Sequence, residues 1–296
     1  MKKVLSSNAL KIIACLAMLF DHIGKIVYLF FPTESMYWLN YAFSIIGRLA
    51  LPIFVFLLIE GFYHTKNIKK YFIRLGIMAA IIGLSEIILA FIPSLNMTDT
   101  LFKAGNIFID LLLILLTLFF YHSKEVRLKI CVIFPLAYFI ISLLLQNETI
   151  FIFNDNLKAL MSGFLTQYSF ISPLIIVLYL LIHYIYNYII HKKYDEEALK
   201  TIDIESFKRD IRTNSYILSI SLISLLMYSF TYLIQDNTIL NTSYVINTYF
   251  ILSIFVIYFY NGKLGKTNQY IQGAYYLFYP LHLGIIFLIT YLISLF

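Results

Sequence analysis

The sequence predicts an all-α membrane protein, a polytopic helical bundle with about nine transmembrane helices. Hydrophobic residues make up 61% of its 296 residues and charged residues only 13%, and the mean hydropathy is +0.83. Soluble domains carry about 25% charged residues. Runs of about 20 apolar residues recur along the chain, and each is long enough to cross a bilayer as a helix. We therefore expect residues 1–296 to form a single integral membrane domain.

The first apolar run, from about Ala9 to Phe31, is too long for the hydrophobic part of a signal peptide and contains ionisable residues. It is therefore expected to be a retained helix. The stretch 150–170 is left open as a re-entrant or interfacial segment. The predicted helices span about 8–31, 42–62, 71–92, 105–122, 128–146, 168–190, 214–234, 243–260 and 271–295.

Lysine and arginine are concentrated in every second loop, and the loops between these contribute only Lys103 and Lys158. This bias predicts a cytoplasmic N-terminus and an external C-terminus. It also accounts for most of the net charge of +6, which therefore does not indicate binding to nucleic acid. A high content of Ile, Lys, Asn, Tyr and Phe is typical of proteins from low-GC bacteria. We therefore expect a multi-pass protein of the cytoplasmic membrane. The basic clusters lie near residues 2–3, 66–74, 124–129, 192–212 and 263–266.

Three ionisable residues lie within five positions of one another in the first predicted helix: Asp21, His22 and Lys25. An ionisable side chain near the bilayer centre costs about 2.5–3.5 kcal/mol on insertion scales. Asp21 and Lys25 are four residues apart and can neutralise each other on one helix face. His22 points about 100° away from Asp21 and has no comparable partner on its own helix. We therefore expect His22 to carry the chemistry.

Five further polar residues are predicted in the outer half of the membrane: Arg48, Glu86, Asn106, Asp110 and His282. Because exposure to lipid is costly, we expect them to converge with Asp21 and His22 around an internal cavity. Arg48 is interpreted either as a clamp paired with Glu86 or Asp110 or as a binder of an anionic substrate group. Glu86 is weighed between an ion-pair partner and a catalytic base. Asn106 and Asp110 are weighed between interhelical contacts and substrate binding, and His282 between a core and a functional histidine.

A second cluster follows the second predicted helix and contains basic, amide and tyrosine side chains beside a short loop. Part of it is ordinary anchoring at the cytoplasmic face, but the same residue types hold phosphorylated ligands. Cys15 and Cys131 provide no zinc framework, and no metal site is expected. The candidate cofactor-binding residues are Tyr63, His64, Lys66, Asn67, Lys70 and Arg74.

Several strings, taken in this order, resemble the TraX family of membrane proteins. They include IGRLALPIF at 46–54, EGFYHTKN at 60–67 and FYPLHL at 278–283. The resemblance is dense over about residues 9–120 and returns near 275–284. The other matching strings lie at 10–14, 18–24, 71–75, 85–87 and 106–108.

The resemblance implies an activity, because TraX is associated with N-terminal acetylation of conjugative pilin. The family is similar to a wider group of transmembrane acyltransferases, in which a histidine of the first helix is the proposed catalytic group and acyl-CoA is the cytoplasmic donor. It therefore implies acetyl-CoA as the donor, a pilin amine or a surface glycan hydroxyl as the acceptor, and His22 as the catalytic position. The Arg48 and Glu86 segments match the polar core of that group. Apart from the resemblance, Asp21 and His282 are expected to take part in catalysis, with His282 as a second proton carrier.

Two other functions fit the same residues. A transporter for a small anion or a proton-coupled solute would use the polar groups as its pathway, although the chain lacks the internal repeats common in transporters. A non-catalytic scaffold for assembling a surface structure would use the charges only as clamps between helices. These two alternatives predict no consumption of acetyl-CoA.

Overall fold

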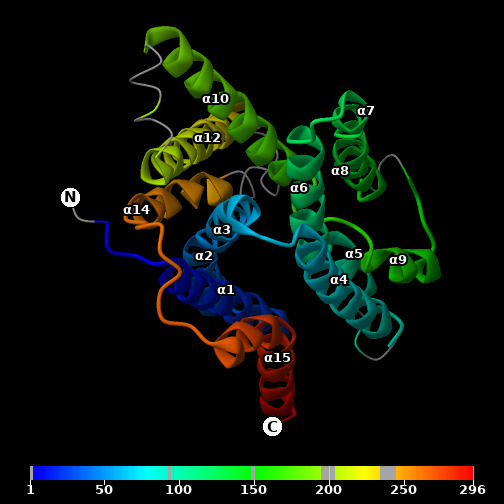
Figure 1. Ribbon diagram of the computed structural model, residues 1–296. Helices are drawn as coiled ribbons and strands as arrows, with labels where there is room; N and C mark the ends of the chain where they lie inside the picture. The colour runs from blue at the N-terminus through cyan, green and yellow to red at the C-terminus, as the bar shows by residue number, and fades with distance from the viewer. Residues whose placement is uncertain are drawn as a thin grey trace. The chain divides into compact units, whose positions relative to one another are not determined.

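A computed structural model describes residues 3–92, 95, 97–147, 151–194, 200, 204–233 and 245–295. In these residues the regular structure is helical, apart from an isolated bridge between Leu5 and Tyr260. The elements (Figure 1) are α1 Ser7–Phe30, α2 Glu34–Gly47, α3 Ala50–His64, α4 Ile68–Ala90, α5 Thr98–Ala104, α6 Ile107–Tyr121, α7 Val126–Ile130, α8 Ile133–Leu145, α9 Asp155–Ser162, α10 Ile171–Lys193, α12 Glu205–Leu233, the 3₁₀ turn η2 Tyr249–Ile251, α14 Leu252–Tyr258 and α15 Gln269–Ser294.

Short polar residues define where many of these helices begin. The side-chain oxygens of Ser6, Thr33, Asn67 and Asn268 each accept a hydrogen bond from the backbone N–H three residues later. Such a bond satisfies one of the N–H groups that a helix leaves without a partner in its first turn. The start of a helix is therefore visible in the sequence where an apolar run follows one of these residues.

Eight helical segments of the described chain are long and apolar enough to cross a membrane. The predicted all-α membrane fold is confirmed, and the number of spans is close to the nine expected. Residue 234 and residues 243–244, at the ends of two predicted spans, lie outside the described residues, and the orientation stays a prediction. The segments are Ser7–Phe30, Glu34–His64, Ile68–Ala90, Thr98–Tyr121, Val126–Leu145, Ile171–Lys193, Glu205–Thr231 and Tyr270–Ser294, with Val245–Tyr258 as a shorter apolar helix.

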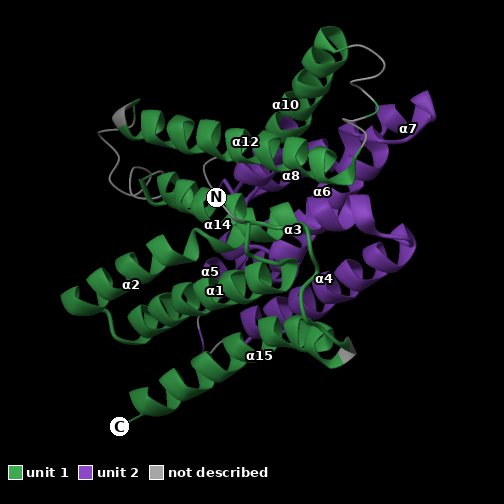
Figure 2. Ribbon diagram, turned by 60° about the vertical axis from the view of Figure 1, so that its left-hand side comes forward, with its two compact units in different colours: residues 1–57, 178–296 green, residues 58–177 purple. Residues whose placement is uncertain are grey.

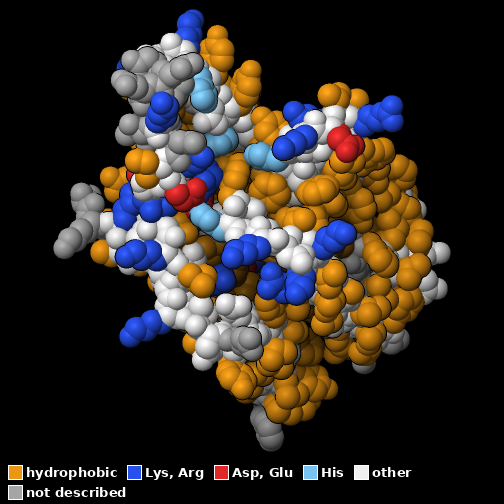
Figure 3. All heavy atoms as spheres, in the orientation of Figure 1, with side chains coloured by type: hydrophobic (Ala, Val, Ile, Leu, Met, Phe, Trp, Pro, Cys, Tyr) orange, Lys and Arg blue, Asp and Glu red, His pale blue; other side chains and the backbone are white. Residues whose placement is uncertain are grey.

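The surface of α4 illustrates why the protein belongs in lipid. Ile73, Ile77, Ile81, Leu84 and Ile88 recur every three or four residues, so they form one stripe, and 44–62% of each is exposed. Hydrophobic side chains cover much of the face drawn in Figure 3. Exposed apolar patches of this kind are rare on soluble monomers. The protein is therefore a multi-pass membrane protein.

The chain forms two compact units (Figure 2), the first comprising Met1–Leu57 and Leu178–Phe296 and the second Leu58–Val177. In the first unit, α1 packs against α2 and α15, and α12 packs against α14. In the second unit, α4 packs against α5, α6 and α9, and α6 also packs against α7 and α8. The boundaries between the units fall within α3 and α10. That residues 1–296 act as one membrane domain stays a prediction.

The helix expected at 42–62 begins earlier than expected and is interrupted. Thr33 starts α2 at Glu34, and α2 ends where the N–H of Arg48 donates to the carbonyls of both Ser44 and Ile45, at 3.2 Å each. Pro52 lacks the N–H that would donate to the carbonyl of Arg48, so the helical hydrogen bonding cannot run unbroken through this position. The interruption sets Arg48 at the junction between α2 and α3.

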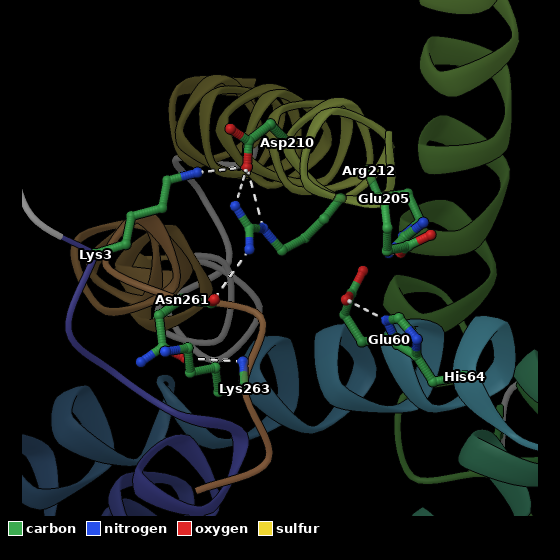
Figure 4. Close-up of polar contacts among 9 residues, drawn as sticks. Lys3, Glu60, His64, Glu205, Asp210, Arg212, Asn261 and Lys263 are labelled. Carbon is green, nitrogen blue, oxygen red and sulfur yellow. Dashed lines mark hydrogen bonds and ion pairs between the residues drawn. The ribbon is translucent and has the colours of Figure 1, made fainter. Parts of the chain in front are cut away.

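The segment before α1 is tied to the loop after α14. Leu5 donates to the carbonyl of Phe259 at 2.9 Å and accepts from the N–H of Asn261 at 2.8 Å. Figure 4 shows the polar contacts near this loop: Lys3 donates to Asp210 at 2.6 Å, and the N–H of Lys263 donates to the side chain of Asn261 at 2.8 Å. These bonds fix the beginning of α1 within the first unit.

Candidate functional site

Asp21 lies on α1 between two cations. Its Oδ2 accepts from Nζ of Lys25 at 2.6 Å, and its Oδ1 lies 3.5 Å from Nη2 of Arg48. The carboxylate is buried, with 9% of the side chain exposed, whereas 42% of the Lys25 side chain is exposed. The pairing of Asp21 with Lys25 was expected from their spacing and is confirmed. The contact with Arg48 joins α1 to the end of α2.

Gly47 allows α2 to approach this carboxylate closely. A β-carbon at Gly47 would lie 2.5 Å from Cβ of Asp21 and 2.7 Å from its Cγ, distances that real β-carbons do not show. One turn further along α1, a β-carbon at Gly24 would lie 3.0 Å from the Cα of Asn40. The two glycines therefore permit the close packing of α1 and α2 that brings Asp21 near Arg48.

Arg48 is held by three groups of the first unit. Besides the contact with Asp21, its Nε donates to the carbonyl of Ser44 at 3.3 Å, and its Nη1 donates to Oδ1 of Asn247 at 2.9 Å. Within the first unit, the carboxylate that Arg48 meets is that of Asp21. A pairing with Glu86 or Asp110, which belong to the second unit, stays a prediction. Asn247 was not singled out, because a lone Asn beside an apolar run carries no signal of its partner.

His22 and His282 form a hydrogen-bonded pair between α1 and α15. Nδ1 of His22 lies 2.7 Å from Nε2 of His282, and the ring centroids are 4.9 Å apart. Nδ1 of His282 lies 2.7 Å from the carbonyl oxygen of Phe278. Pro280 removes a donor from the same stretch of α15 and loosens its regular hydrogen bonding. The predicted partner residues of the first unit thus meet as two groups, Asp21 with Arg48 and His22 with His282.

The histidine pair has apolar and aromatic surroundings. The ring of Phe278 stacks on His282 with centroids 4.6 Å apart, and the ring of Tyr279 meets both histidines edge-on. Phe278 and Tyr279 also pack against a small core that contains Met18, one turn before His22. These neighbours exclude water from one side of the pair.

Asn106 and Asp110, predicted to bind substrate, make structural contacts in the second unit. Asn106 caps α6 by accepting from the N–H of Phe108 at 3.0 Å, and its amide donates to the carbonyl of Ala79 at 2.8 Å. Asp110 is fully buried and accepts from the backbone N–H groups of Gln167 and Tyr168, at 2.7 and 3.1 Å. These contacts account for both side chains as parts of the fold, and substrate binding by them stays a prediction.

Glu86 also lies in the second unit, on α4. Its Oε2 is buried and makes no hydrogen bond within the described part of the chain. Glu86, Asn106 and Asp110 belong to the second unit and His22 to the first, and their convergence around one cavity stays a prediction.

The candidate cofactor-binding residues lie at the end of α3 and the start of α4. Tyr63 hydrogen-bonds to Nε2 of His122 at 2.9 Å, and His64 lies 3.4 Å from the buried carboxylate of Glu60. Figure 4 shows the Glu60–His64 contact along α3. Asn67 caps α4. The other three candidates have exposed side chains: Lys66, Lys70 and Arg74.

His122, which follows α6, forms a defined contact with Tyr63. Its Nδ1 lies 3.0 Å from the carbonyl of Leu118, so Nδ1 carries the proton and Nε2 accepts from the hydroxyl of Tyr63. Burial lowers the pKa of His122, and the charge of Lys129 acts in the same direction, against the hydrogen bond to Leu118. The neutral ring is therefore favoured at this end of α6.

Comparison with known proteins decides the family. The family model described as TraX protein matches residues 6–290, which is nearly the whole chain. The chain belongs to the TraX family. The resemblance in the strings of its first four predicted helices is thereby confirmed, and the match extends through the middle of the chain, where no string was recognisable.

One curated relative of this TraX-family protein comes from Dichelobacter nodosus and is described as "Probable fimbrial assembly protein FimC, serogroup H1". It is 34% identical over 136 residues, which make up 45% of this chain and 54% of that protein. The chain thus spans about half the length of this relative. No solved structure matches the chain.

Proposed function

We propose that this TraX-family protein is a membrane acetyltransferase. It would move an acetyl group from cytoplasmic acetyl-CoA to an acceptor on the outer side of the membrane, a pilin N-terminal amine or a surface glycan hydroxyl. The observation that carries the proposal is the His22–His282 pair beside Asp21 and Arg48, within helices long enough to cross the bilayer. A hydrogen-bonded histidine next to a guanidinium matches the two needs of acyl transfer, a base and a group that stabilises an oxyanion.

In the proposed reaction, His22 removes the proton from the acceptor amine or hydroxyl as it attacks the thioester carbonyl. The carbon–sulfur bond of acetyl-CoA then breaks, the proton passes to the departing thiolate, and free CoA and the acetylated acceptor result. Arg48, held by Asn247 and the carbonyl of Ser44, would stabilise the negative charge on the carbonyl oxygen. Asp21 would hold Arg48 and Lys25 near this position.

The exposed basic side chains of the second unit support a place for the phosphates of CoA. Lys66, Lys70 and Arg74 lie within nine positions of one another, shortly after Tyr63 in the chain. Lysine and arginine bind phosphate groups through charge-assisted hydrogen bonds. We assign donor binding to these residues together with His64 and Asn67, and catalysis to the first unit.

The test uses membrane vesicles containing the protein and acetyl-CoA labelled in its acetyl group, with label counted in the protein and glycan of the outer face. We expect His22→Ala to lower incorporation by about 10²-fold or more, the usual contribution of a general base. His191→Ala provides the matched control, because His191 is an exposed histidine at the end of α10. Undiminished incorporation by His22→Ala would exclude the proposal.

A second possible function is the assembly of a surface structure without catalysis. One observation favours it: the relative from Dichelobacter nodosus is described as a probable fimbrial assembly protein. Under this alternative, Asp21 and Arg48 act only as a clamp. A double-mutant cycle on the pair would then show a coupling in stability with no acetyl transfer in any variant.

A further inference from the structure

Two short contacts in series determine where the protons of the histidine pair lie. The first joins Nδ1 of His282 to the carbonyl oxygen of Phe278, and the second joins Nε2 of His282 to Nδ1 of His22, each at 2.7 Å. A carbonyl oxygen can only accept, so Nδ1 of His282 must carry a proton. The nature of the second contact follows from this first assignment.

A neutral imidazole carries one proton, so Nε2 of His282 is bare and accepts. The proton in the second contact therefore belongs to Nδ1 of His22. A neutral His22 then has a bare Nε2. A charged ring at His282, which is 5% exposed and stacked against Phe278, would instead cost several kcal/mol of desolvation.

We infer that His282 is a positioning residue that holds His22 in its Nδ1–H tautomer, so that Nε2 of His22 is the atom that takes the acceptor's proton. The inference rests on the proposed function for the reaction, but the proton arrangement itself follows from the two contacts. A third group that orients a base and fixes its tautomer is a recurrent arrangement in acyl transfer. Here a neutral histidine, anchored to a backbone carbonyl, takes that role.

This assignment replaces the expectation that His282 is a second proton carrier. The carbonyl oxygen of Phe278 accepts a hydrogen bond but does not take up the proton, so the series ends there and leads no further. Proton transfer in the reaction then involves Nε2 of His22 alone. The stacking of Phe278 and the edge contact of Tyr279 keep the His282 ring oriented toward α1.

The first experiment measures the tautomer directly, by ¹⁵N NMR of ring-labelled histidine in the full-length protein in micelles. The His22 signals are assigned by their loss in His22→Gln. In the wild type we expect a protonated Nδ1 and a bare Nε2, and in His282→Ala we expect a shift toward the Nε2–H form, which predominates in free histidine. His191→Ala should leave the His22 signals unchanged. A protonated Nε2 in the wild type, or no change in His282→Ala, would overturn the inference.

The second experiment compares His282→Ala with His282→Gln, whose amide oxygen can reach the position of Nε2 and accept from His22. We expect kcat of His282→Ala to fall about 10–100-fold, the range found when a hydrogen-bond partner that orients a metal-bound histidine is removed, with an unchanged KM for acetyl-CoA. In His282→Gln, the Nδ1–H tautomer and most of the activity should return. Loss of activity in His282→Gln with the Nδ1–H tautomer intact would overturn the positioning role in favour of a proton carrier.

The two proposals can fail separately. If the wild type transfers no acetyl group, the proposed function is wrong, while the NMR result still decides whether His282 sets the tautomer of His22. If transfer occurs and depends on His22 but the tautomer does not depend on His282, only the positioning role is wrong.

Discussion

Asp21 and Asp110 are both buried carboxylates in helices that can cross the membrane, but their partners differ. Asp110 accepts from two backbone N–H groups, those of Gln167 and Tyr168, just before α10 begins. Asp21 faces two side-chain cations, Lys25 at 2.6 Å and Arg48 at 3.5 Å. One carboxylate is therefore bound to parts of the chain that cannot move without changing the fold, and the other to side chains that can rotate.

The comparison separates a structural acid from a candidate catalytic one. Buried backbone N–H groups need an acceptor. Asp110 is the acceptor for two such groups in the segment that precedes α10. The carboxylate of Asp21 accepts from side chains rather than from backbone N–H groups, and Asp21 directly precedes His22 in the chain. The expense of keeping such charges in a membrane suggests that they are retained for function.

The largest effect is expected for Asp21→Asn, which removes the negative charge beside two cations. Breaking a buried ion pair from one side commonly lowers the free energy of unfolding by about 3–5 kcal/mol. Thermal unfolding in detergent micelles would measure the loss. An unchanged melting temperature together with lower acetyl transfer would mean that Asp21 acts only in the reaction. The Asp21–Arg48 contact would then not stabilise the packing of α1 against α2.

Asp110→Asn should have a smaller effect of a different kind. An Asn can keep one of the two backbone N–H bonds through its Oδ1, and the second N–H would lose its charged acceptor, at about 1–3 kcal/mol. We expect a lower melting temperature for the purified protein. The earlier expectation that Asp110 binds substrate predicts a raised KM for the acceptor in the protein that remains folded, so KM and melting temperature together distinguish the two roles.

Gly47→Ala tests whether the close approach of α2 to Asp21 matters. The added methyl group would overlap Cβ and Cγ of Asp21, and overpacking of this kind costs about 1–3 kcal/mol. Gly76→Ala on α4 is the matched control, since a β-carbon there would meet nothing within 4 Å and Ala favours a helix over Gly by about 0.5–1 kcal/mol. We expect the two substitutions to change the melting temperature in opposite directions, and equal changes would refute the packing argument.

Much of the fold was readable from the sequence, because apolar runs and capping residues are local signals. The all-α membrane class and most helix positions follow from them, as does the pairing of Asp21 with Lys25. The interruption at Arg48 was missed because the apolar run continues through it, and only Pro52 marks the break. The early start of α2 was missed because Glu34, Asn40 and the aromatic residues between them precede the continuous apolar run.

The candidate site could be predicted residue by residue but not pair by pair. His22, Arg48 and His282 stand out because polar groups in apolar helices are costly. Their partners come from segments more than 190 positions away in the chain, as for Arg48 with Asn247 and His22 with His282. No spacing rule reaches that far, and only the packing of α1 against α2 shows that Arg48 meets Asp21.

The smallest effect on stability is expected at the Tyr63–His122 contact. Like the His22–His282 pair it contains a histidine, and here the dependence of stability on pH can be tested. Tyr63→Phe removes one hydrogen bond and should lower the free energy of unfolding by about 0.5–1.5 kcal/mol near neutral pH. Burial holds the pKa of His122 below its usual value of about 6.5, so as the pH falls past that value the unfolded chain gains a proton before the folded one does.

Stability contributed by His122 is therefore present above about pH 6.5 and decreases as the pH falls toward the lowered pKa of the folded protein. We expect the wild type to lose more stability than His122→Gln between about pH 7.5 and about pH 5.5, since glutamine cannot take up a proton. Melting temperatures of the two proteins across this range measure the difference. Parallel curves would mean that His122 ionises equally easily in both states and that its buried contact with Tyr63 does not favour the neutral ring.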